Sequence, residues 1–133
     1  MEPELIDYIA REGEQNCWDI ALLELGINVL GWDKEKFIAR VENVIKQIAG
    51  RNPDKTIYVI SPFYCNDDYL NIGKANEWRN IIEDIVHRLM FDNVIYINGL
   101  DLLGDMSLIS ADEVHPNIYG VAQIAQRLQS RII

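Results

Sequence analysis

A carboxylate and an imidazole lie three residues apart in the run Asp-Glu-Val-His-Pro of residues 112–116. A carboxylate that accepts a hydrogen bond from one imidazole nitrogen fixes the tautomer and stabilises the imidazolium. The other nitrogen can then take a proton from a nucleophile. Asp112 and His115 therefore predict the acid–base pair of a serine-esterase type of site. The same spacing also suits a surface turn in which Asp112 caps local amides and His115 merely precedes Pro116.

A second candidate set follows the apolar run of residues 19–25, where Gly26 and Asn28 lie two residues apart. Gly26 permits an unusual backbone conformation or a close approach. The side-chain amide of Asn28 can donate to a developing oxyanion, an interaction worth ~2.7 to 4 kcal/mol in comparable sites. The alternative interpretation is an ordinary turn, because glycine and asparagine are common after strands.

The remaining polar groups predict less. His87 has Glu83 and Asp84 one helical turn away, which is typical of a solvated histidine, and we assign it no role. The run of residues 66–68 (Asn-Asp-Asp) has the oxygen ligands of a hard cation but lacks the spacing of a calcium loop, so a polar turn is favoured. Aromatic side chains could line a pocket, although core packing or loop anchoring is the commoner use; these are Tyr64, Tyr69 and Trp78. We expect no metal and no cofactor.

The elements that must position these residues alternate along the chain. Helical periodicity and capping signals predict helices, and β-branched or apolar runs predict strands. The expected helices are 4–11, 33–50, 74–90 and about 116–131, and the expected strands are 19–25, 56–61 and 93–97. This order predicts an α/β fold with a parallel sheet and helices on both faces.

In such sheets ligands bind beyond the carboxyl ends of the strands. Three segments qualify in advance, namely 26–30, 61–73 and 98–116. The two candidate sets above fall in the first and the third. The last helix is expected to place Pro116 at its first turn and to bury one apolar stripe. That stripe consists of Val121, Ile124, Ala125, Leu128 and Ile132.

Length and composition limit the classes of protein. A chain of 133 residues with 49% hydrophobic and 25% charged residues fits one globular domain over residues 1–133. The net charge of −9 would repel phosphate backbones, so we expect no nucleic-acid partner. No run of apolar residues is long enough for a membrane span. Two cysteines without a CxxC motif, and an acidic N-terminus without an apolar leader, favour a reducing, cytoplasmic setting.

Three segments together resemble the SGNH hydrolases, also called GDSL esterases or lipases. They are residues 24–28 (ELGIN) after a buried strand, residues 60–62 (ISP) after the next, and residues 110–117 (SADEVHPN) before the final helix. The match is in order, spacing and type of element, and it spans nearly the whole chain. The final segment, followed by Gly120 and an amphipathic helix, is its most specific part.

The resemblance implies a flavodoxin-like three-layer α/β/α sandwich that hydrolyses esters of small acyl, lipid or acylated-sugar compounds. It implies that His115 is the general base and then the general acid, and that Asp112 orients it. Asn28, beside Gly26, would form the oxyanion hole. The family commonly has aspartate after this asparagine, whereas this chain has Val29, a difference that bears on the subfamily more than on the mechanism.

A graver departure concerns the nucleophile. The family's serine lies in a Gly-Asp-Ser motif on its first strand, and this chain contains no such motif. The run of residues 104–107 (Gly-Asp-Met-Ser) is a chance approximation after the wrong strand. None of the four serines lies on a nucleophile-elbow sequence; they are Ser61, Ser107, Ser110 and Ser130. We therefore expect an N-terminally truncated domain that lacks its nucleophile and is inactive as an isolated chain.

A missing first strand has a consequence for association. In a flavodoxin-like sheet of order 2-1-3-4-5, this chain would hold strands 3, 4 and 5, and the strand Ile20 to Leu25 would become an edge. An apolar edge normally pairs with another chain. We expect a homodimer or larger assembly through this edge, or association with the missing segment. Two functions stay open: an ester hydrolase domain acting on a small-molecule substrate, and a noncatalytic α/β module that binds a ligand or partner.

Overall fold

The protein is described by a computed structural model that covers residues 2–132, so that Met1 and Ile133 lie outside the described residues. Three strands, β1 (Ile20–Glu24), β2 (Thr56–Ile60) and β3 (Val94–Ile97), alternate with helices. The longer helices are α1 (Pro3–Glu14), α2 (Lys34–Arg51), α4 (Lys74–Leu89) and α6 (Ile118–Ile132). The predicted order of long helices and strands is confirmed.

The strands form a parallel sheet in the order β1-β2-β3. The central strand β2 is buried on both faces because its neighbours and the covering helices leave it no solvent side. Strand β1 pairs with β2 from Ile20 opposite Thr56 to Glu24 opposite Ile60, and no described strand pairs with its other side. All carboxyl ends therefore meet at one edge of the sheet, with β1 as an open flank.

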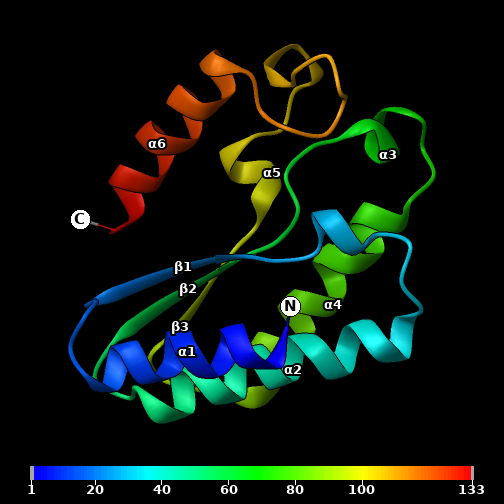
Figure 1. Ribbon diagram of the computed structural model, residues 1–133. Helices are drawn as coiled ribbons and strands as arrows, with labels where there is room; N and C mark the ends of the chain where they lie inside the picture. The colour runs from blue at the N-terminus through cyan, green and yellow to red at the C-terminus, as the bar shows by residue number, and fades with distance from the viewer. Residues whose placement is uncertain (1, 133) are drawn as a thin grey trace.

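Helices cover both faces of the sheet, as expected (Figure 1). Helices α1, α2 and α4 lie on one face, and their apolar sides enclose the larger core together with Ile57 and Val59 of β2. Helix α6 and the short helix α5 (Gly99–Leu102) lie on the other face, over a smaller core that includes Tyr58 and Ile60. The fold is a three-layer α/β/α sandwich.

Capping residues set several helix ends. Asp33 caps α2 by accepting from the backbone nitrogen of Lys36 at 2.8 Å. Asn117 caps α6, because its Oδ1 accepts from the nitrogens of Tyr119 and Gly120, each at 3.0 Å. Pro116 therefore lies before α6 and pairs in an isolated bridge with Ile109, so its predicted place in the first turn was wrong.

The segments after β2 and β3 hold more structure than expected. A short helix α3 (Asn66–Tyr69) interrupts the loop after β2, and α5 and a 3₁₀ turn η2 (Met106–Leu108) follow β3. A further 3₁₀ turn, η1 (Ile27–Val29), follows β1. These elements are one turn long, too short for a hydrophobic period to reveal.

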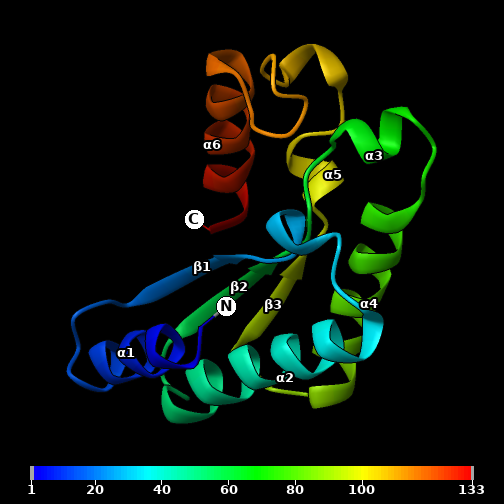
Figure 2. The same ribbon diagram turned by 45° about the vertical axis from the view of Figure 1, so that its right-hand side comes forward.

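The prediction for the stripe of α6 was only partly right. Ile124, Leu128 and Ile132 pack against the smaller core, but Val121 is 56% exposed and Ala125 is also exposed. Figure 2 shows α6 on the opposite side of the sheet from α1 and α2. The apolar stripe is therefore wider than the surface that covers it. No helix among residues 2–132 is long and apolar enough to cross a membrane.

Candidate active site

Asp112 and His115 lie on a tight loop between η2 and α6. The backbone nitrogen of Ser110 donates to the carbonyl of His115 at 2.7 Å, and that of Asn117 donates to Leu108 at 2.8 Å, which closes the loop on itself. Glu113, between the two candidate residues, adopts a left-handed conformation with φ of 62°. The loop thereby turns back sharply enough for a carboxylate to meet an imidazole three residues later.

The contact between the two side chains is short. Nδ1 of His115 lies 2.6 Å from Oδ2 of Asp112, and both side chains are exposed. This contact leaves Nε2 as the imidazole nitrogen available to exchange a proton. The geometry is the one that the acid–base interpretation requires.

The other oxygen of Asp112 also serves the loop. Its Oδ1 accepts from the backbone nitrogens of His115 at 2.8 Å and Val114 at 2.9 Å, and from the hydroxyl of Ser110 at 2.7 Å. These bonds, the backbone bond from His115 foremost, hold the pKa of Asp112 well below its usual value. The carboxylate thus stays ionised near neutral pH, as an orienting group must. Asp112 therefore caps local amides, as the turn interpretation predicts, and also contacts the imidazole, as the acid–base interpretation requires.

Gly26 and Asn28 begin the turn after β1. Gly26 has φ of 112°, and a Cβ added there would lie 3.0 Å from a ring carbon of Pro62, so both conformation and space favour glycine. Asn28 lies in η1 and is exposed, with its amide free to meet a ligand beyond the strand end. This exposure at the end of β1 is what the predicted role of an oxyanion donor requires.

Glu24, the last residue of β1, lines the pocket beside Asn28 and was given no role by sequence reasoning. Its Oε1 is buried with no hydrogen-bond partner among the described residues. Burial raises the pKa of Glu24 to about 7, against smaller opposing effects of the Ile27 backbone and the charge of His115. A lone carboxylate inside an apolar strand was the signal available in the sequence.

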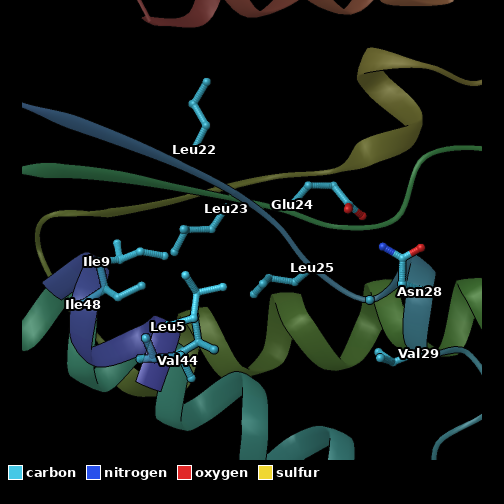
Figure 3. A pocket seen from close by; sticks show the side chains of 12 residues that line it. Leu5, Ile9, Leu22, Leu23, Glu24, Leu25, Asn28, Val29, Val44 and Ile48 are labelled. Atoms are coloured by element: carbon cyan, nitrogen blue, oxygen red, sulfur yellow. The ribbon is translucent and has the colours of Figure 1, made fainter. Parts of the chain in front are cut away.

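A pocket of about 310 Å³ follows the open flank of β1 (Figure 3). Its walls are apolar, with Leu5 and Ile9 of α1 facing Leu23 of the strand, and Glu24 and Asn28 lie at its polar end. Glu24 and Asn28 thus place the polar end of the pocket at the carboxyl end of β1.

The other candidates have structural partners. Ser61 is fully buried, and its Oγ accepts from Gly99 at 3.0 Å and from the Tyr96 hydroxyl at 3.1 Å, so it cannot meet a substrate. Trp78 packs in the core, stacked on Phe37 at 4.2 Å between ring centroids. Tyr69 is 62% exposed on α3. The hydroxyl of Ser110 donates to Oδ1 of Asp112 at 2.7 Å.

The acidic run after β2 is structural as well. Asp67 accepts from the backbone nitrogen of Ala75 at 2.8 Å, and Asp68 pairs with the buried Arg79. Among residues 2–132 there is no group of three acidic, histidine or cysteine side chains that could hold a metal ion. His87 is exposed on α4, as expected of a solvated histidine.

Comparisons with known proteins agree on the fold. No family model and no curated protein matches the chain. Similar solved structures show that the chain has the SGNH-hydrolase fold, a flavodoxin-like α/β/α sandwich. The sequence motifs had predicted this fold.

Three of these structures show the extent of the likeness. The salicylyl-acyltransferase SsfX3 of a tetracycline biosynthetic pathway aligns with a TM-score of 0.77 and 21% identity over 98% of this chain and 40% of its own. A protein named as a GDSL-like lipase from Bacteroides ovatus aligns with a TM-score of 0.76 and 19% identity, over 99% of this chain and 39% of its own. The family 3 carbohydrate esterase of Clostridium thermocellum aligns with a TM-score of 0.73 and 20% identity, over 96% of this chain and 62% of its own. The chain thus spans about two-fifths to three-fifths of the lengths of these proteins.

Proposed function

We propose that this chain carries the acid–base pair and an oxyanion donor of an acyl-ester hydrolase of the SGNH type. The observation that carries the proposal is the 2.6 Å contact between His115 and an Asp112 that the loop keeps ionised. Esterases and an acyltransferase share the fold, which supports this class of chemistry over a purely structural loop. The substrate class is an ester of a small acyl, lipid or acylated-sugar compound.

In the proposed reaction Nε2 of His115 takes the proton of a serine hydroxyl as its oxygen attacks the ester carbonyl. The amide of Asn28, beside Gly26, donates to the oxyanion that forms. The imidazolium, stabilised by Asp112, then protonates the leaving alcohol, and water repeats the sequence to release the acid. Each proton taken by His115 is returned within its half-reaction.

The serine in this proposal comes from outside the printed sequence. Ser61 is buried in structural bonds and Ser110 donates to Asp112, so neither suits the role. We propose that an apolar strand with the nucleophile at its carboxyl end pairs in parallel along the open side of β1. Parallel pairing would bring that end to the edge of the sheet where Asn28 lies and near which His115 acts. The flank supports this, because Ile20 and Leu22 are 45% and 48% exposed.

The test uses an extended polypeptide in which the sequence encoded upstream of Met1 precedes the chain. We expect a strand ending in Gly-Asp-Ser there, and hydrolysis of p-nitrophenyl acetate by the extended polypeptide but not by the printed chain. His115→Ala should lower kcat/KM by about 10³-fold or more, because the base is lost. His87→Ala is the matched control and should leave the rate unchanged. An unchanged rate in His115→Ala, or no activity with or without the upstream sequence, would favour the noncatalytic module.

A further inference from the structure

Arg79 of α4 is an arginine buried beneath the loop that follows β2. Its side chain is 2% exposed, and it donates from Nε to the carbonyl of Pro62 and from Nη2 to that of Phe63, both at 2.8 Å. Its two Nη atoms also bind both oxygens of Asp68 at 2.7 Å each. One guanidinium thus fixes both the start of the loop and the short helix α3.

Asp68 extends this network toward the loop that carries Asp112 and His115. Its Oδ2 accepts from the backbone nitrogen of Cys65 at 3.1 Å, which caps α3. The next backbone nitrogen, that of Asn66, donates to the carbonyl of Glu113 at 2.9 Å. Glu113 is the left-handed residue between Asp112 and His115. Arg79 is therefore connected to the loop of the candidate pair by a short path of hydrogen bonds.

Stability alone is a weak reason for such a group. Removing an arginine and a carboxylate from water is costly, and well-packed apolar replacements of a buried ion pair are often as stable. The guanidinium fork instead fixes direction, because its planar donors match a carboxylate and two carbonyls at once. The arrangement suits a group that must hold a loop in one conformation.

We propose that Arg79 is a positioning residue for the Asp112–His115 pair, acting through Asp68, Asn66 and Glu113. This inference rests on the proposed function of that pair. Loss of the guanidinium frees the Asn66 amide from Glu113, so that the turn over residues 112–115 relaxes and Asp112 no longer holds Nδ1 of His115.

The test follows the two histidines by ¹⁵N NMR in the 133-residue chain. In Arg79→Met, and in Arg79→Met/Asp68→Asn, which leaves no isolated buried charge, we expect His115 to change from one tautomer to a mixture. We also expect the Asn66 amide to exchange about tenfold faster or more. The signals of His87 and the exchange of Ile57 and Val59 should stay unchanged, which separates local loosening from unfolding. Arg79→Lys, which keeps the positive charge, should keep part of the wild-type behaviour of His115 and of the Asn66 amide.

Arg88→Met is the matched control, since Arg88 lies on the same helix but pairs at the surface with Glu42. It should leave the His115 signals unaltered. An unaltered His115 tautomer and an unaltered Asn66 exchange rate in the folded double variant would overturn the inference. Failure of the proposed hydrolase activity would leave these NMR outcomes intact, so the two hypotheses can be distinguished.

Discussion

Glu24 shows how a single buried carboxylate makes stability depend on pH. Its pKa in the folded protein is about 7, above the ordinary value of 4.5, so the folded state holds its proton more tightly than the unfolded state does. The contribution of Glu24 to the free energy of unfolding is therefore highest below about pH 4.5 and declines as the pH rises from there to about 7. Because Oε1 has no partner among the described residues, the Ile27 backbone and the charge of His115 only partly offset the cost of burying the charged form.

We expect Glu24→Gln to remove this decline. In urea unfolding, the variant should gain on the order of 1 to 2 kcal/mol relative to wild type on going from pH 5 to pH 8. Glu4→Gln, at an exposed position of α1, is the matched control and should follow wild type. Equal pH dependence in wild type and Glu24→Gln would show that Glu24 is solvated in solution.

At the scale of elements, the fit of α6 against the site loop depends on Gly120. A Cβ at this position would collide with the backbone oxygen of Leu108 and lie 3.2 Å from side-chain atoms of Leu103 and Pro116. The helix can therefore approach the loop that carries His115 only where there is no side chain.

We expect Gly120→Ala to destabilise the protein. Alanine would gain up to ~1 kcal/mol in helix propensity. Overpacking against a backbone oxygen typically costs about 1 to 3 kcal/mol, so we expect a net loss of stability. Thermal unfolding of the variant checks this, with Gly31→Ala as the control because a Cβ there meets nothing within 4 Å. A higher melting temperature for Gly120→Ala would contradict the close approach.

At the scale of the whole molecule, the open flank of β1 is the feature from which we predict association. Its exposed apolar side chains and the adjoining pocket leave backbone groups and apolar surface without a described partner. Edges of this kind normally pair with a further strand. The opposite edge, β3, offers a matched comparison because Ile95 is 44% exposed there.

We expect the free amides among Ile20 to Leu25 to exchange rapidly in the printed chain and at least about 100-fold more slowly in the extended polypeptide. Leu22→Lys should destabilise the extended polypeptide, whereas Ile95→Lys should have little effect. Hydrogen exchange and thermal unfolding measure both. A stable dimer of the printed chain with protected β1 amides would instead identify a second copy as the occupant, and equal effects of the two lysines would contradict strand pairing at β1.

Long helices and strands were predictable because their apolar periods are properties of neighbouring residues. Asp33 as a helix cap and the Asp112–His115 contact were predictable for the same reason, since both act across three residues. One-turn elements such as α3 and α5 were not, because no period fits within four residues. The roles of Asp112, His115 and Asn28 in catalysis stay predictions.

The sequence by itself determined the order of the elements, the parallel sheet and the short-range pair on the loop before α6, because each depends on local pattern. Only the tertiary structure decided that Oε1 of Glu24 is buried without a partner among the described residues, that Arg79 holds the loop of residues 62–68, and that two of the five residues of the α6 stripe stay exposed. Periodicity tells which face of an element is apolar, but only the packing of distant segments determines what covers that face. For Asp112 and His115, the sequence placed two groups within reach, and the fold set them at the carboxyl end of the sheet.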